Sequence, residues 1–268
     1  MRYLLSILLF ISTQVYSEVY RYEYFAVFPF WESPVQPFKF ASPLTQQDAQ
    51  KKIHIQVGYD ANNRVIDVQT RQGEQYKALG NFFDAMYVHT VHTKVRYQKD
   101  KELHHFYNKL GNRVTAWGDI WEKVYLKDER GRYIKMNLLN RAGEPVDNSW
   151  GITNYSWEHQ LDGSIIEERR SLLGELKTHR PGFEFKRIRL HFDEKGHLRL
   201  MQNIDESNQL SAAKSGASQY SYFYDTNGSF ERWEIYDADG KAAIGPSNTA
   251  GESYIRQVDG SLKISFFN

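Results

Sequence analysis

Short runs in which apolar and polar residues alternate fill the second half of the chain. Examples are NYSWEHQLD (154–162), FKRIRLHFD (185–193), QYSYFYD (219–225) and RWEIYD (232–237). Each run is rich in aromatic residues and is bounded by Asp, Asn or Gly, which favour tight turns. A period of two between such turns is typical of antiparallel hairpins. We therefore predict strands for these runs. One short helix is predicted where Ser42 would be the N-cap and Pro43 would lie in the first turn.

The turns recur at a nearly constant spacing, which indicates an internal repeat. Successive turn glycines are 32, 33, 32 and 32 residues apart, and in the first four units a second turn follows after 11 or 12 residues. These glycines are Gly131, Gly163, Gly196, Gly228 and Gly260. A hairpin repeated in this way builds a sheet that grows by the addition of neighbours.

A sheet of ten or more strands cannot stay flat and open, so it should twist, coil or close. The predicted fold class is all-β, an antiparallel meander of tandem hairpin repeats of ~32 residues in a long twisted or coiled sheet, with little helix. The repeat domain is expected to span 101–268. The aromatic-rich and proline-rich segment 18–100 is expected to cap one edge of the sheet, because an exposed edge invites association.

Residues 1–17, MRYLLSILLFISTQVYS, have the pattern of a secretory signal peptide. Arg2 supplies the positive charge, an apolar run covers 3–11, and residues 15–17 offer a cleavage site. The run is too short to span a bilayer, which takes ~20 residues. An uncleaved anchor or a buried strand is the alternative. We expect a periplasmic or secreted protein without an integral membrane segment after cleavage.

Composition excludes several classes of function. The net charge is +1, which gives no electrostatic reason to expect a nucleic acid as partner. The absence of Cys rules out disulfides and thiolate metal sites. Neither a P-loop nor a GxGxxG motif occurs, so no cofactor is expected. Aromatic residues make up 15% of the chain, which suits half-buried strands as well as binding of protein or carbohydrate.

Two kinds of short motif carry a resemblance to known families. Units of the form [Tyr/Phe]-Asp-x-x-Gly occur at 192–196 and 224–228, and Trp-Gly occurs at 117–118 and 150–151. In turn pattern, over residues ~100–268, the chain resembles bacterial secreted β-repeat proteins of the YD-repeat and WG-repeat type. The unit is longer than a usual YD repeat, and the two later units lack Trp-Gly. The resemblance implies a surface, envelope or interaction scaffold and no particular reaction.

The acidic turns DTNG (225–228) and DADG (237–240) have some likeness to calcium loops. An EF-hand loop requires Gly at position 6 and Glu at position 12, whereas Gly is at position 4 here. We therefore interpret them as hairpin corners, with calcium as the alternative. His89 and His92 are three apart and would face opposite sides of a strand, so they would share a zinc ion only on a helix. No metal site is predicted.

One position breaks the repeat. Five residues after the turn glycine, three units carry Met136, Met201 and Trp233, whereas the unit of Gly163 carries Glu168. A carboxylate in an apolar column should be partly buried, with a raised pKa or a cationic partner. This unit is also one residue short between its turns, so a register slip that turns Glu168 outward is an alternative. The candidate ligand-binding residues are Glu168, Arg169, Arg170, His191 and Trp157; a structural charge cluster remains the competing interpretation.

Two functions are compatible with these features. The first is a non-enzymatic scaffold whose aromatic face binds a protein or glycan of the cell envelope. The second is a glycan-active hydrolase or lyase in which Glu167 or Glu168 does acid–base chemistry, Arg169 or Arg170 binds a uronate or sulfate, and Tyr155 or Trp157 stacks on sugars. Neighbouring residues on a strand face opposite sides, so Glu167 and Glu168 cannot easily act as one catalytic pair, and the sequence identifies no second acid. No catalytic residue is assigned.

Overall fold

A computed structural model describes residues 17–28, 32–78, 90–257 and 262–268. In these ranges it has one antiparallel sheet of 17 strands and one short helix, α1 (Gln46–Ala49). The strands are β1 (Arg21–Val27), β2 (Ala41–Leu44), β3 (Ile53–Tyr59), β4 (Val65–Gln72), β5 (Gln75–Tyr76), β6 (His92–Tyr97), β7 (Lys101–Tyr107), β8 (Glu122–Lys127), β9 (Tyr133–Leu139), β10 (Asn154–His159), β11 (Ile165–Arg170), β12 (Arg187–Phe192), β13 (Leu198–Asn203), β14 (Gln219–Tyr224), β15 (Phe230–Tyr236), β16 (Gly251–Arg256) and β17 (Leu262–Phe267).

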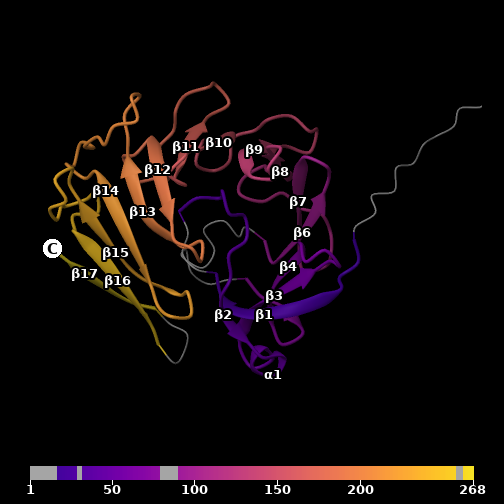
Figure 1. Ribbon diagram of the computed structural model, residues 1–268. Coiled ribbons are helices and arrows are strands. Elements are labelled where there is room, and N and C mark those ends of the chain that lie inside the picture. The colour runs from indigo at the N-terminus through magenta and orange to yellow at the C-terminus, as the bar shows by residue number, and fades with distance from the viewer. Residues whose placement is uncertain (1–16, 29–31, 79–89, 258–261) are drawn as a thin grey trace, which may run out of the picture.

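The sheet is a long meander that bends round on itself without closing. From β6 to β17 each strand pairs with the next one in sequence, and β4 pairs with β3, β5 and β6. At the other end β1 lies between β2 and β3. In Figure 1 the arc runs from β17 through β10 and β9 to β1 and β3. The predicted fold class is confirmed.

The repeat corresponds to successive hairpins. β8–β9, β10–β11, β12–β13 and β14–β15 each contain one of the first four turn glycines. β16 and β17 form a fifth hairpin; Gly260, the fifth predicted turn glycine, lies outside the described residues. Residues 18–100, expected to cap the sheet, supply β1 to β6 at one end of it, with β2 outermost. No helix in the described ranges is long and apolar enough to cross a membrane.

The acidic turns use their carboxylates to hold the backbone. Asp225 Oδ1 accepts hydrogen bonds from the backbone N–H groups of Asn227 and Ser229, both at 2.8 Å. The backbone N–H of Asp225 donates to the carbonyl of Ser229 at 2.8 Å, and Gly228 takes φ +81°. Asp237 makes the same pair of bonds in the second turn. Both loops are corners of hairpins, as the sequence predicted.

The predicted helix begins later than expected. Ser42 and Pro43 belong to strand β2, and the helix is a single turn whose N-cap is Thr45. The Thr45 side chain accepts a hydrogen bond from the backbone N–H of Asp48, so it satisfies one of the free donors at the helix start. Ser42 has φ +56°, which is incompatible with a helix cap in the extended conformation. The prediction of a Ser42 cap is therefore wrong.

Residues 32–40 run through the inside of the curve instead of adding a strand to the sheet (Figure 1). Val35 is buried, and the Phe38 ring stacks on His104 of β7 with ring centres 4.8 Å apart. The inner faces of the hairpins supply the rest of the apolar core, which includes Met136, Leu138, Ile188, Leu190, Met201 and Ile235. A strongly curved sheet leaves space on its concave side, and this segment fills part of it.

The corner assignment predicts how Asp225 variants behave. Asp225→Ala removes the acceptor of two backbone N–H groups and should lower the free energy of unfolding by about 1–2 kcal/mol. Asp225→Asn keeps a side-chain oxygen and should lose clearly less. Chemical denaturation with and without millimolar Ca²⁺ measures both effects. Stabilisation of the wild type by Ca²⁺ that Asp225→Ala abolishes would contradict the corner assignment.

Candidate functional site

The β10–β11 hairpin lacks a β-bulge, and this places Glu167 on the inner face of the sheet, at the position that Met136, Met201 and Trp233 fill in the sister hairpins. Hairpins β8–β9, β12–β13 and β14–β15 each shift register by one residue near the turn, whereas β10–β11 does not. Glu167 therefore pairs with Trp157 in the position where Met136 pairs with Tyr125. Its side chain is fully buried. The shorter unit noted in the sequence is the unit without the bulge residue.

Glu168, the residue expected at this position, faces outward. Its carboxylate forms ion pairs with Arg170 at 2.8 Å and with Arg187 at 2.9 Å, and its side chain is 24% exposed. The predicted inward position of Glu168 is therefore wrong, and the alternative of a register slip that turns Glu168 outward is correct; Glu167 takes the inward position, and Glu168 keeps cationic partners on the outer face. His191 lies on β12, where its Nε2 is 3.0 Å from Gln202 Oε1, and it does not join this group.

Of the five predicted site residues, Arg169 and Trp157 meet at the buried Glu167. Trp157 Nε1–H donates to Glu167 Oε2 at 2.6 Å, and an Arg169 Nη2–H donates to Oε1. The hydroxyl of Ser33, from the segment inside the curve, donates to Oε2 as well. Both members of the Glu167–Arg169 pair are fully buried. Both carboxylate oxygens of Glu167 thus accept hydrogen bonds, and Arg169 is at once a donor and the direct cationic partner.

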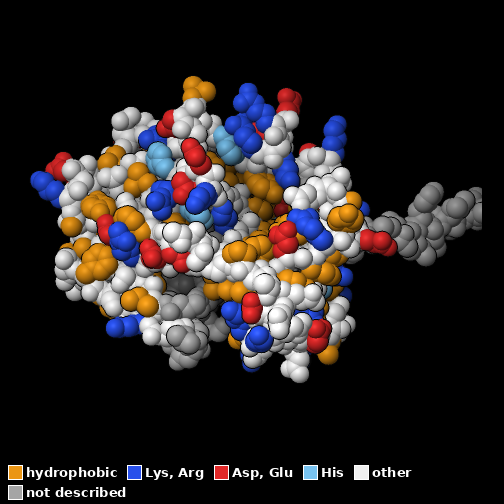
Figure 2. Space-filling model, turned by 60° about the horizontal axis from the view of Figure 1, so that its bottom comes forward, with side chains coloured by type: hydrophobic (Ala, Val, Ile, Leu, Met, Phe, Trp, Pro, Cys, Tyr) orange, Lys and Arg blue, Asp and Glu red, His pale blue; other side chains and the backbone are white. Residues whose placement is uncertain are grey.

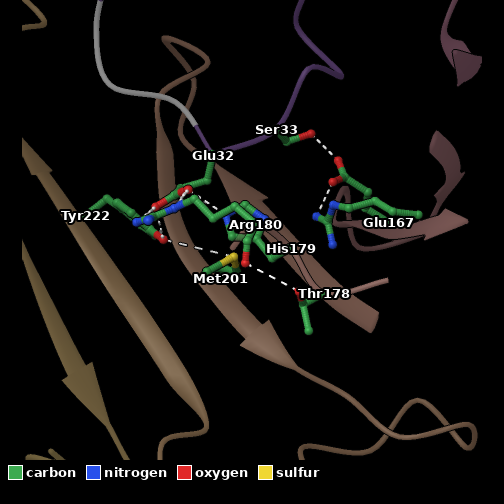
Figure 3. A network of polar contacts seen from close by, with 9 residues as sticks. Glu32, Ser33, Glu167, Thr178, His179, Arg180, Met201 and Tyr222 are labelled. Atoms are coloured by element: carbon green, nitrogen blue, oxygen red, sulfur yellow. Dashed lines mark hydrogen bonds and ion pairs between the residues drawn. The ribbon is translucent and has the colours of Figure 1, made fainter. Parts of the chain in front are cut away.

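Glu32, next to Ser33, is the centre of a second buried network of hydrogen bonds and ion pairs, besides the one around Glu167 (Figure 3). Its Oε2 lies 2.5 Å from His179 Nε2 and accepts from Arg180 Nε at 3.1 Å, and the Tyr222 hydroxyl donates to Oε1 at 3.4 Å. Burial alone would raise the pKa of Glu32, but the charges and hydrogen bonds of Arg180 and His179 lower it to about 2. Burial, together with the nearby charges of Arg169 and Arg180, lowers the pKa of His179, against the opposing effect of Glu32.

The networks around Glu167 and Glu32 hold residues 32–40, here called the inner segment, against the repeat sheet. Glu32 binds the loop between β11 and β12 through His179 and Arg180, and Ser33 binds β11 through Glu167. We call these residues, with Arg169 and Trp157, the clamp. Arg169 Nε, Arg169 Nη1 and His179 Nδ1 are also buried, and in the described structure they have no hydrogen-bond partner. The clamp can thus engage further polar groups, but its carboxylates are already occupied.

Sequence reasoning missed Glu32, Ser33, His179 and Arg180. Glu32 had a usable signal, because it is the only charged residue between Glu23 and Lys39 in a run rich in aromatic residues and proline. A lone carboxylate in such a run must find donors when the run is buried. The positions of its partners, nearly 150 residues away, had no such signal.

A recess opens beside the clamp. Its aromatic members are Phe183, Tyr220 and Trp233, whose ring centres are 5.1–5.7 Å apart. The Arg180 guanidinium lies over the Phe183 ring at 3.8 Å, so Arg180 belongs to both the clamp and the recess. The remaining lining consists of Pro181, Gly182, Pro246, Ser247 and Glu252. Such a combination of rings with a few charged groups suits a ligand that has both flat apolar faces and hydroxyls.

Other buried charges lie along the inner face near β7 and β8. Glu102 is bound by His104 at 2.8 Å and by Lys127 at 3.0 Å, and despite its burial these contacts lower its pKa. Burial lowers the pKa of Lys123 to about 7. Lys123 also lies 5.1 Å from the Trp117 ring centre. These groups pack inside the sheet and do not line the recess.

No cluster of three or more potential metal ligands occurs in the portion of the chain that the structure describes. His92 Nε2 lies 2.6 Å from Asp67 Oδ1, and His89 falls outside the described residues.

Comparison with known proteins gives no functional assignment. No family model and no curated protein matches the chain. One solved structure with partial similarity is an alternansucrase in complex with isomaltononaose, which is 14% identical, with a TM-score of 0.13. The match covers 79% of this chain and 18% of the alternansucrase chain. At that TM-score the likeness carries no argument about fold or function.

The inward and outward glutamates predict very different mutational effects. Glu167→Gln leaves Arg169 charged and buried without a carboxylate, so it should cost about 3–5 kcal/mol of unfolding free energy. The adjacent control Glu168→Gln breaks partly exposed ion pairs and should cost about 1 kcal/mol or less. Denaturant unfolding of the two variants measures the difference. Equal losses of unfolding free energy in the two variants would show that Glu167 does not occupy the inward position.

The residues of the neighbouring β8–β9 hairpin suggest a double variant that should recover the stability lost in Glu167→Gln. β9 carries Met136 and Leu138 at the positions of Glu167 and Arg169. The double variant Glu167→Met/Arg169→Leu removes both charges together and should be more stable than Glu167→Gln alone, because no buried charge is left unpaired. A double variant less stable than the single one would contradict this.

Because its pKa is lowered in the folded protein, Glu32 should make the free energy of unfolding fall at low pH. A carboxyl whose pKa is lower in the folded than in the unfolded chain stabilises the fold above its unfolded pKa, and this contribution is lost as pH falls through the folded pKa. Between about pH 5 and pH 2, the wild type should therefore lose stability more steeply than Glu32→Gln. The two curves should converge near pH 2. Parallel curves from denaturation at a series of pH values would rule out this role for Glu32.

Proposed function

We propose that this protein is a secreted or periplasmic, non-enzymatic scaffold of the YD-repeat or WG-repeat type that binds a glycan of the cell envelope. The observation that carries the proposal is the recess beside the clamp, where the partly exposed Phe183 ring, packed on the buried rings of Tyr220 and Trp233, adjoins Arg180, Ser247 and Glu252. Aromatic faces stack on sugar rings, and the polar groups at the rim can bind hydroxyls. The signal-peptide pattern of residues 1–17 supports the location.

The engagement of the buried carboxylates supports binding over catalysis. Glu32 and Glu167 are fully buried and hold arginines, so neither is poised to transfer a proton to a ligand. The alternative function, a glycan hydrolase or lyase that uses Glu168, has less support. Glu168 lies on the outer face in ion pairs with Arg170 and Arg187, opposite to the face that carries Glu167.

The recess can be blocked without disturbing the core. Ser247 lies at its rim and is exposed, so Ser247→Trp should fill it and weaken binding to envelope glycans by about 10-fold or more. Ser207 is also exposed, in the turn after β13, and Ser207→Trp is the matched control that should bind as the wild type does. Titration of purified envelope glycans by calorimetry, with unfolding curves of both variants, provides the measurement.

Three results would count against the proposal. Equal binding by the Ser247→Trp and Ser207→Trp proteins would remove the recess from the site. Absence of any glycan binding by the wild type would leave a protein partner as the better interpretation of the scaffold. Product release from an envelope glycan by the purified wild type would overturn the non-enzymatic assignment.

A further inference from the structure

The last strand of the sheet has an apolar surface and an open edge. β17 pairs with β16, and no other described strand pairs with it. Ile264 and Phe266 are 41% and 66% exposed. Their cross-strand partners are Tyr254 and Glu252, and Glu252 in turn pairs with Trp233 of the core. Ile264 and Phe266 therefore continue the inner face of the sheet, where the previous hairpins bury such residues against a neighbour.

Hydrophobic side chains are exposed on the side of the molecule that carries the C-terminal hairpins, and others lie across the rest of the face that Figure 2 shows (Figures 1 and 2). Ile255 on β16 is 55% exposed but pairs with Lys263, so it lies on the opposite, outer face of the sheet. Natural sheets usually protect an edge with proline, with charged side chains such as Lys, with a bulge or with a covering loop. β17 has no proline, and its one charged residue is Lys263. An edge of this kind is suited to pairing with another strand.

The opposite edge is protected. Its outermost strand, β2, is four residues long and contains Pro43 and a Ser42 with φ +56°. The turn between β14 and β15 also covers it: the backbone N–H of Ser42 donates to the carbonyl of Asn227 at 3.2 Å, and the Ser42 and Ser229 hydroxyls lie 2.8 Å apart. A head-to-tail assembly of β17 onto β2 is thereby blocked. Pairing of β17 with another β17 is not.

We propose that β17 pairs antiparallel with β17 of a second copy of this chain, about a two-fold axis at Ile264. This register sets Ile264 against Ile264, Lys263 against Ser265, and Phe266 against position 262, which is Leu. Apolar positions thus meet apolar positions, and the two Lys263 ammonium groups do not oppose each other. A strand whose pattern is complementary to itself in this way favours a closed two-fold dimer. The sheet then continues from one copy into the other.

The complete absence of Cys from the chain allows a direct test of the register. Directly opposed Cβ atoms in antiparallel strands lie ~4.5–5.5 Å apart, so Ile264→Cys should form an intermolecular disulfide under mild oxidation. A mixture of Lys263→Cys and Ser265→Cys should cross-link to the heterodimer more than either variant does to itself. Ser207→Cys, exposed in a distant turn, is the control and should stay uncross-linked under the same conditions.

Sedimentation of the purified chain at micromolar concentrations supplies the second readout. The wild type should dimerise, and Ile264→Lys should weaken the dimer by at least ~10-fold, because two ammonium groups would face each other across the axis. Ser207→Lys is the matched charge control and should dimerise as the wild type does. A monomeric wild type, a dimer unaffected by Ile264→Lys, or a dimer in which Ile264→Cys fails to cross-link would each overturn the proposal.

Discussion

The buried pair of Glu167 and Arg169 constrains much of the interior. The absence of one bulge residue in the β10–β11 hairpin turns Glu167 inward, at a position that sister hairpins fill with Met136, Met201 and Trp233. A carboxylate at this depth is tolerated only if cations and hydrogen-bond donors surround it. Arg169 provides the charge, and the Ser33 hydroxyl, from a different part of the chain, completes the shell. The absence of one bulge residue thus leads to a direct contact between the inner segment, through Ser33, and the β10–β11 hairpin.

That tie matters because a meander has few contacts between distant strands. Each hairpin in such a sheet touches mainly its two neighbours, so little holds the curvature fixed. Residues 32–40 supply the missing long-range contacts on the concave side, through the clamp at Glu32 and Ser33 and through the ring contact of Phe38 with His104. Polar contacts suit this task because they are directional, whereas apolar packing alone would tolerate sliding of the segment.

The sequence was sufficient to predict the hairpins, because alternation and turn chemistry are local. Asp225 and Gly228 determine their corner with residues at most four positions away. The site was only partly predictable. The short unit marked the right hairpin, but the choice between Glu167 and Glu168 depends on a bulge, which shifts every later side chain to the other face. His179 and Arg180 could not be linked to Glu32 at all, since that contact arises from the curvature of the whole sheet and leaves no local pattern.

Arg180 connects the stability of the interior with the surface where binding is proposed. Its guanidinium binds Glu32 in the clamp and lies against Phe183 in the recess, so it cannot adjust to a ligand without loosening the inner segment. Preorganisation of this kind lowers the entropy cost of binding and limits the ligands that fit. The same rigidity disfavours an acid–base role for Glu32, because a carboxylate that keeps an arginine in place stays ionised and cannot donate a proton. The clamp is therefore better suited to shape a binding surface than to carry out a reaction.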